Sequence, residues 1–373
     1  MFPHLDLPDR SQVDRLLTSR RPASVSLYLT TDPVQGADAE RLELRNLLDE
    51  AVRQLREAGH DKRETAEIQN LVRELVDDAL FWEYQARSLA VFATPDDITT
   101  YRLPHQLSSL VEVSDRFHVK PLLRALTFPS SGYVLALSEN AVRVLEVLPE
   151  GEPGLLSPQG MPRDAADAAG RPSISDRSPR GRVQGGEGRK MRLGQYSRAV
   201  DQALHPLLVG RDIPLILAAT QPLDGIYRQW NTYPHLAVES LEGNPDSAAD
   251  HDLAARARKV IDLVNASALA EVKDLFDERA SAGRAATDVA DVARAATYAM
   301  VDTVLVDIDA VMPGTIDETS GVVIFAEKNA AGSYGIVDEI ARRVWLTGGR
   351  VLAVRREDIP GGRAVAAILR WAS

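Results

Sequence analysis

Cysteine is absent from this chain of 373 residues. Its absence excludes disulfides, zinc–thiolate sites, iron–sulfur clusters and cysteine nucleophiles, and it fits a reducing compartment. Apolar runs of about 18 residues, the length that a membrane-spanning helix needs, are also lacking. The start of the chain is polar and contains Pro3 and Pro8, so it predicts no signal peptide. We therefore expect a soluble, cytoplasmic protein that does not contact membranes.

The usual signatures of metal, nucleotide and acyl-transfer chemistry are missing as well. The seven histidines show no i, i+4 pairing and no H-E-x-x-H motif, and no G-x-S-x-G elbow exists. Gly181 and Gly186 have the spacing of a P-loop, but Glu187-Gly188 stand where Lys and Ser or Thr are required. We expect no metal, no cofactor and no catalytic residue of these classes.

The charge is acidic overall but basic in one segment. The formal net charge of −11 makes the chain as a whole repel nucleic acid. Residues 177–198 contain seven basic residues against one acid, Glu187, with glycines between them. Positive charge on a glycine-rich segment is typical of binding to a phosphate backbone, because each neutralised phosphate releases counterions. A solvated, disordered surface loop is the alternative that composition leaves open.

Hydrophobic periodicity predicts an α/β protein of three domains. These are an N-terminal α/β domain (1–125), a middle domain with a long basic, glycine-rich loop at 150–194 (126–245), and a C-terminal α/β sandwich (246–373). The expected helices are 37–57, 61–82, 195–209, 222–230, 253–276, 288–300 and 334–346. The expected strands are 23–30, 88–93, 133–137, 142–147, 214–219, 303–307, 321–325, 350–354 and 364–369.

Two segments, 81–84 and 227–230, combine aromatic with charged residues. Their rings are able to stack on nucleic-acid bases. Packing at the ends of helices is the interpretation that we favour.

The landmarks of all three expected domains form a known pattern. The segments that carry it are 24–29 and 88–92; 132–137, 185–186 and 215–219; and 275–278, 283–288 and 301–306. In this order they resemble the bacterial relatives of the archaeo-eukaryotic class I release factor and Pelota superfamily. The resemblance implies an RNase H-like middle domain and an L7Ae/Pelota-like C-terminal α/β sandwich.

The resemblance also bears on activity. Release factors of this superfamily carry Gly-Gly-Gln on the middle-domain loop, which promotes peptidyl-tRNA hydrolysis. Here Gly185 and Gly186 match and Glu187 replaces the Gln. A carboxylate repels both RNA phosphates and a developing oxyanion, so we expect no hydrolysis. A peptidyl-tRNA hydrolase that uses Gln184 stays open as an alternative. An RNase H-like nuclease would need acidic residues on its first strand, and 133–137 has none.

The sequence therefore predicts a release-factor-like or Pelota-like protein that acts in translation rescue or ribosome hibernation. Its partners would be the ribosome or tRNA, with a translational GTPase as a further candidate and no DNA expected. The predicted RNA-binding residues are Arg182, Gly185, Gly186, Arg189, Lys190 and Arg192. The alternative is a stress-linked protein-interaction module that kept the fold without ribosome binding.

Overall fold

The computed structural model describes the chain apart from a few segments. The described residues are 5–32, 37–149, 151–170, 186–326 and 334–371. The chain divides into two compact units, called unit 1 (Met1–Phe128 with Ala268–Ser373) and unit 2 (Pro129–Ser267). Both combine helices with β-sheets, which confirms the expected α/β class. In the described part of the chain, no helix is both long and apolar enough to cross a membrane.

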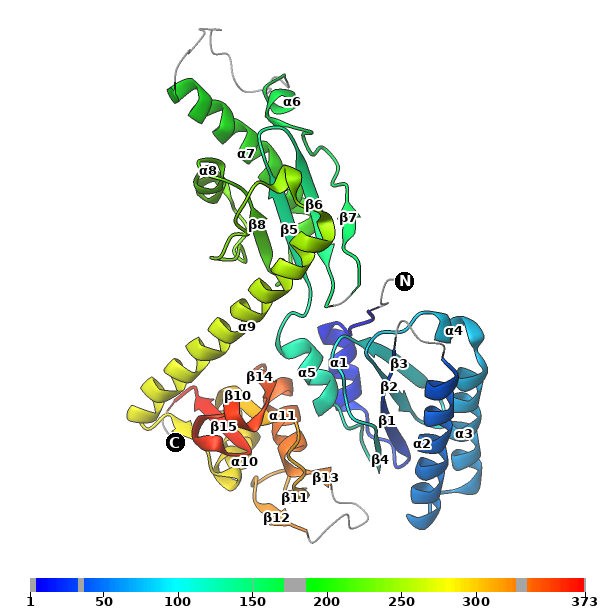
Figure 1. Ribbon diagram of the computed structural model, residues 1–373. Helices are drawn as coiled ribbons and strands as arrows, with labels where there is room; N and C mark the ends of the chain where they lie inside the picture. Colours follow the sequence, from blue (N-terminus) through cyan, green and yellow to red (C-terminus); the bar gives the residue numbers. More distant parts are fainter. Residues whose placement is uncertain (1–4, 33–36, 150, 171–185, 327–333, 372–373) are drawn as a thin grey trace. The chain divides into compact units, whose positions relative to one another are not determined.

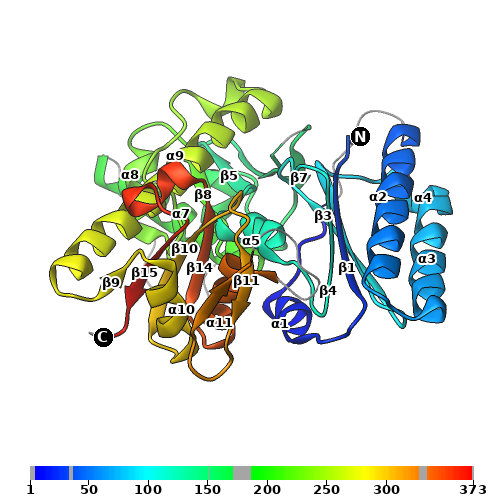
Figure 2. The same cartoon turned by 90° about the horizontal axis from the view of Figure 1, so that it is seen from below.

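The first part of unit 1 is an antiparallel sheet with helices on both faces (Figure 2). Its elements are α1 (Arg10–Thr18), β1 (Ser24–Thr30), α2 (Asp38–Glu57), α3 (Lys62–Asp77), α4 (Ala79–Glu83), β2 (Ser88–Ala93), β3 (Ile98–Leu103), β4 (Leu110–Ser114) and α5 (Lys120–Thr127). The strand order is β3-β2-β1-β4. Successive side chains of a strand point to opposite faces. Val25 and Leu27 of β1 therefore pack with α2 and α3, whereas Tyr28 packs with α1 and α5.

The second part of unit 1 is a mixed sheet in the order β14-β10-β15-β9. The chain between β10 and β14 forms a smaller sheet in the order β12-β11-β13. Its elements are the end of α9 (Asp250–Ser281), β9 (Ala285–Ala286), α10 (Val289–Thr297), β10 (Val301–Asp307), β11 (Pro313–Ile316), β12 (Val323–Phe325), β13 (Tyr334–Gly335), α11 (Ile336–Leu346), β14 (Arg350–Val354), the 3-10 turns η2 (Arg356–Asp358) and η3 (Pro360–Gly362), and β15 (Val365–Leu369). β10 is parallel to β14 and antiparallel to β15. Helices α10 and α11 cover one face, and Val272 and Phe276 of α9 cover the other.

Unit 2 is built on one four-stranded sheet in the order β7-β6-β5-β8. Its elements are β5 (Gly132–Leu137), β6 (Val142–Val147), β7 (Gly154–Leu156), α6 (Ala165–Gly170), α7 (Gly186–Leu208), β8 (Leu215–Ala218), α8 (Leu223–Trp230), the 3-10 turn η1 (Pro245–Ser247) and the first part of α9. β5 and β6 form the expected antiparallel hairpin, and β8 is parallel to β5. Helices α7 and α8 pack on one face and α9 on the other (Figure 1).

Most expected helices and strands are confirmed within a few residues, but one expectation is wrong. The segment 150–194 is not a loop throughout: β7 and α6 lie within it, and α7 begins at Gly186 rather than at 195. The short elements α1, β3, β4, α5, β9 and β11 were not expected. The division into three domains stays a proposal; each expected domain contains one of the four-stranded sheets. The boundary between the two units falls inside α9.

Candidate RNA-binding surface at the start of helix α7

Helix α7 begins earlier than its apolar pattern predicts. Its first turns contain Arg, Lys, Met, Leu and Gln, which have high helix propensity, and also three glycines, which have low helix propensity. From Leu193 onwards, one side of the helix is buried: Leu193, Tyr196, Val200 and Leu204 pack against the sheet of unit 2. Packing of this apolar side stabilises the helix, which then extends N-terminally through its basic residues.

A glycine within α7 has a packing role. Gly194 lies against the indole of Trp230, the last residue of α8, and a Cβ atom on Gly194 would come within 3.0 Å of the indole Nε1. The small residue therefore allows the two helices to approach closely. The prediction of a loop up to Gly194 is wrong, since this residue lies inside α7. Its contact with Trp230, 36 positions further along the chain, is not visible in the local sequence.

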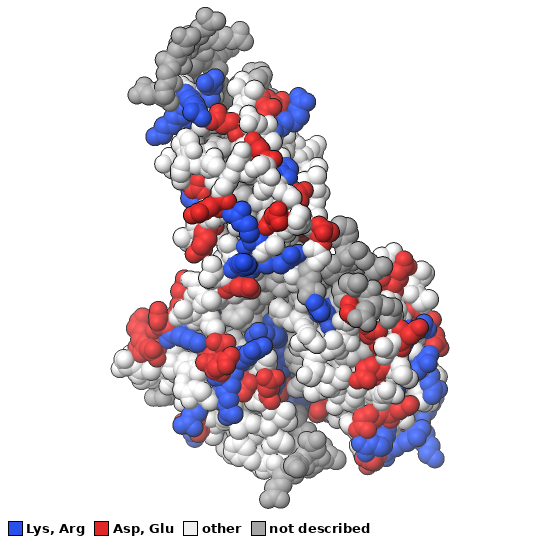
Figure 3. Space-filling model, in the orientation of Figure 1, with Lys and Arg blue, Asp and Glu red and all other residues white. Residues whose placement is uncertain are grey.

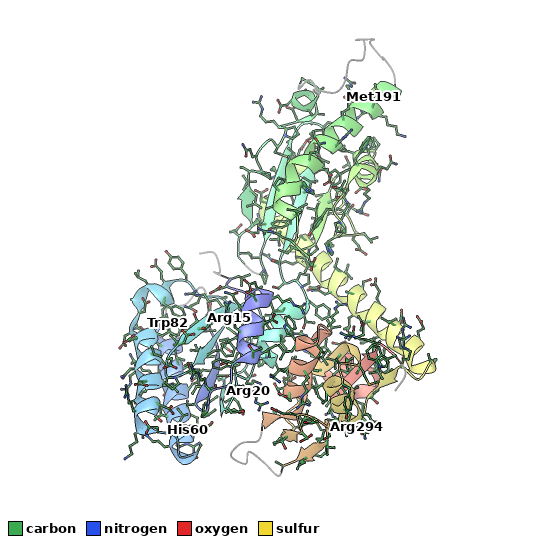
Figure 4. The ribbon with its side chains drawn as sticks, turned by 180° about the vertical axis from the view of Figure 1, so that it is seen from behind. Arg15, Arg20, His60, Trp82, Met191 and Arg294 are labelled. Atoms are coloured by element: carbon green, nitrogen blue, oxygen red, sulfur yellow. The ribbon has the colours of Figure 1, made fainter. Side chains whose placement is uncertain are left out.

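Basic side chains gather at the start of α7 (Figure 3). Lys190 and Arg192 are exposed, and neither has an ion-pair partner among the described residues. Met191 between them is 56% exposed and marks this end of the helix in Figure 4. Arg189 is also exposed but is paired with Glu139, the residue that follows the β5 strand by two positions.

The charge at this end of α7 has the opposite sign to the one that stabilises a helix. Unpaired N–H groups give the first turn a partial positive charge, so acidic side chains are favoured there and basic ones are not. Three basic residues, Arg189, Lys190 and Arg192, nevertheless occupy the first two turns, against one acid, Glu187. This arrangement favours a bound anion at the surface around them.

The predicted RNA-binding residues are only partly placed by the structure. Arg182 and Gly185 lie outside the described residues, and Gly186 is the first residue of α7. The structure brings Arg189, Lys190 and Arg192 together on adjacent turns. It adds Arg198 and Trp230, whose guanidinium and ring lie 5.8 Å apart. One signal for this arrangement was present in the sequence. A spacing of four residues places Lys190, Gly194 and Arg198 on one side of a helix.

The expectation that the aromatic segments serve packing is confirmed for two of their residues. Trp82 and Tyr227 are buried, and the Trp82 indole N–H donates to the Leu75 carbonyl at 2.9 Å. Tyr84 and Trp230 differ because they are 49% and 42% exposed. Of these two, Trp230 is the one that lies against α7.

The structure shows no arrangement for metal-dependent cleavage in its described part. Among the described residues, no group of three or more metal-ligating side chains exists. All residues of β5 are buried and none is acidic, and the nearby Glu139 is paired with Arg189. Among the described residues of unit 2, the start of α7 carries positive charge, and no carboxylate cluster suited to two-metal chemistry is found.

Comparison with models of protein families gives a match that coincides with unit 2. Residues 129–267 match the model of bacterial archaeo-eukaryotic release factor family 11. Over this stretch, which is less than half of the chain, the protein is release-factor-like. This confirms the resemblance found in the sequence and supports a translation-related protein. A search of curated proteins gives no match.

The solved structures that match this chain include proteins from archaea and yeast. The archaeal translation termination factor aRF1 is 14% identical, with 96% of each chain covered and a TM-score of 0.25. Dom34 of S. cerevisiae, a termination-like factor that interacts with Hbs1, is 13% identical over 74% of this chain and 73% of its own, with a TM-score of 0.45. Archaeal Pelota, from a model of its ribosome-bound form with ABCE1, is 13% identical over 99% and 96%, with a TM-score of 0.38.

Proposed function

We propose that this protein binds the ribosome, or a structured RNA such as tRNA, through the start of α7. It would act in translation rescue or ribosome hibernation. The observation that carries the proposal is the pair of exposed basic side chains, Lys190 and Arg192, at the positively charged end of α7. In a chain with a net charge of −11, such a local surface is the place where phosphates are attracted.

The match of unit 2 to a release-factor family supports translation as the process. The tripeptide Gly185-Gly186-Glu187 supports binding without peptidyl-tRNA hydrolysis, because a carboxylate replaces the Gln of release factors. We further propose that the middle domain (126–245) is RNase H-like and that the C-terminal domain (246–373) is L7Ae/Pelota-like. A translational GTPase as delivery partner is proposed on the resemblance alone.

Co-sedimentation with ribosomes at several salt concentrations tests the proposal. The variant Lys190→Glu/Arg192→Glu reverses both exposed charges. A matched control, Lys62→Glu/Lys259→Glu, changes the net charge equally at two exposed positions of α3 and α9. We expect the wild type and the control to pellet with ribosomes and the α7 variant to remain in the supernatant.

Salt dependence separates binding to phosphates from other kinds of binding. The slope of log affinity against log salt becomes shallower by about 0.7 to 0.9 for each phosphate that the variant no longer neutralises. Equal pelleting of the wild type and the α7 variant would contradict the proposal. Capture of a protein partner without RNA, insensitive to salt, would favour the protein-interaction module instead.

A further inference from the structure

Trp230 is a large aromatic side chain that the fold keeps at the surface. It ends α8 and is 42% exposed. One edge of its indole meets Gly194 of α7, and the guanidinium of Arg198 lies over the ring, 5.8 Å from the centroid. This distance is within the range of a cation–π contact. One edge of the indole thus meets Gly194 and Arg198 lies over the ring, while 42% of the residue stays exposed to solvent.

The chain on both sides of Trp230 is fixed. Before it, Tyr227 is buried between α8 and the sheet. After it, Thr232 donates from its backbone N–H and its hydroxyl to the Asp201 carboxylate of α7, at 3.1 Å and 2.7 Å. Asp201 is itself buried. Because these contacts hold the end of α8 against α7, a ligand that stacks on the indole does not have to order it first.

Basic residues of α7 lie along the same side as the indole. Lys190, Gly194 and Arg198 are spaced by four residues, which places them one above another on a helix. Lys190 and Arg198 are both exposed. An exposed ring between positive side chains is the arrangement with which proteins bind single-stranded nucleic acid, where bases stack on aromatic rings and phosphates meet cations.

We propose that Trp230 is a base-stacking residue for single-stranded RNA. An unpaired base stacks on the exposed indole surface, and the neighbouring phosphates contact Lys190 and Arg198. Arg198 also positions the ring through its guanidinium. The inference rests on the proposed function and deepens it, because it names an unpaired stretch of RNA, rather than a duplex, as the ligand of this surface.

The test uses a short unstructured RNA oligonucleotide, and the same strand annealed to its complement, with the full chain. Stacking on one base corresponds to a loss of about 5- to 150-fold in affinity when the ring is removed. We expect Trp230→Ala to lose this much for the single strand and little for the duplex, with the salt slope unchanged. Trp371→Ala, at another exposed tryptophan, is the matched control and should bind as the wild type does.

Fluorescence supplies a second measurement that does not depend on the alanine variant folding normally. Saturating single-stranded RNA should quench part of the wild-type tryptophan emission. Trp230→Phe keeps an aromatic ring, so it should bind within a few-fold of the wild type yet lose that quenching. Absence of quenching in the wild type, or equal affinity of Trp230→Ala and wild type for the single strand, overturns the inference.

The two proposals fail in different ways. If ribosome binding depends on Lys190 and Arg192 but not on Trp230, base stacking is wrong and the proposed function stands. If the wild type binds neither ribosomes nor the oligonucleotide, both are wrong.

Discussion

The guanidinium of Arg189 pairs with the carboxylate of Glu139, and its Nε lies 3.1 Å from Oε1. The two residues are 50 positions apart in the sequence. The pair connects the first turns of α7 to the turn between β5 and β6, next to the basic surface proposed for RNA. It also places one negative charge at the edge of that surface.

Removing this negative charge should strengthen RNA binding. In Glu139→Gln the carboxylate no longer competes with phosphate for Arg189, so we expect a gain of about two- to five-fold in affinity at low salt. Fluorescence anisotropy with labelled RNA measures the change, and the gain should shrink as salt is added. An affinity equal to or below that of the wild type would show that Arg189 does not face the RNA.

The contact between Gly194 and Trp230 predicts an unusual response to substitution in α7. Gly194→Val adds a branched side chain against the indole, and we expect overpacking to lower the stability of unit 2 by about 1–3 kcal/mol. Gln195→Val, at the exposed neighbouring position, carries only the lower helix propensity of valine, well under about 1 kcal/mol. Thermal unfolding followed by circular dichroism compares the two. Equal effects would mean that the indole does not limit position 194.

A buried carboxylate should be important for the stability of unit 1. Glu339 is 2% exposed and accepts from Arg116 Nη1 at 2.8 Å, Arg343 Nε at 2.9 Å and Arg342 Nη1 at 3.1 Å. Glu339→Gln removes the negative charge that the three guanidinium groups share, and among the described residues only Arg116 keeps another acidic partner, Asp115. We therefore expect a loss of about 3–5 kcal/mol in urea unfolding.

The matched control for Glu339 is Asp291→Asn, which neutralises an acid in the exposed pair with Arg294. Its expected loss is at most about 1 kcal/mol, since surface pairs contribute little. If both variants unfold at the same urea concentration, the charge network around Glu339 does not stabilise unit 1.

Unit 1 should also lose stability as the pH rises towards neutrality. Burial, reinforced by the nearby negative charge of Asp338, raises the pKa of Glu112 from 4.5 to about 7. Between these values the folded protein keeps a proton that the unfolded chain has released. The stabilising contribution is therefore complete below pH 4.5 and is lost as the pH rises through 7.

Glu112→Gln imitates the protonated carboxyl at every pH. We expect its stability relative to the wild type to increase by about 1–3 kcal/mol between about pH 5 and pH 8. Burial lowers the pKa of His105 to about 4, which makes the stability of unit 1 rise with pH, opposite to the effect of Glu112. Both the wild type and Glu112→Gln contain His105, so its contribution cancels in their difference. A difference independent of pH would contradict the raised pKa.

The sequence predicted the elements whose apolar pattern is strong. The strand 88–93 matches β2 residue for residue, and α2 was expected within one residue. Short or half-buried elements were missed for a physical reason. The side chains of β4 are all partly exposed, and α5 begins with Lys120-Pro121 and spans eight residues, too few for a clear period.

The candidate site was predicted by its charge but not by its geometry. Local composition identified Arg189, Lys190 and Arg192, yet glycine content suggested a loop where α7 begins. The structure corrects this prediction of a loop and shows the contact of Gly194 with Trp230, two residues that are far apart in the sequence. Periodicity carries no information on such contacts. The sequence raised base stacking for 227–230 but favoured packing, and the exposure of Trp230 beside α7 came from the folded chain.

Photo-cross-linking from position 191 tests the central claim most directly. Met191 lies between Lys190 and Arg192 and is 56% exposed, and a photoreactive amino acid placed there reports what the start of α7 touches. Leu263, on α9 and 54% exposed, is the matched control position. With ribosomes present, we predict cross-links to ribosomal RNA or tRNA from position 191 and not from position 263. Cross-links to RNA from neither position, or equally from both, would contradict the claim that the start of α7 is the RNA-binding surface.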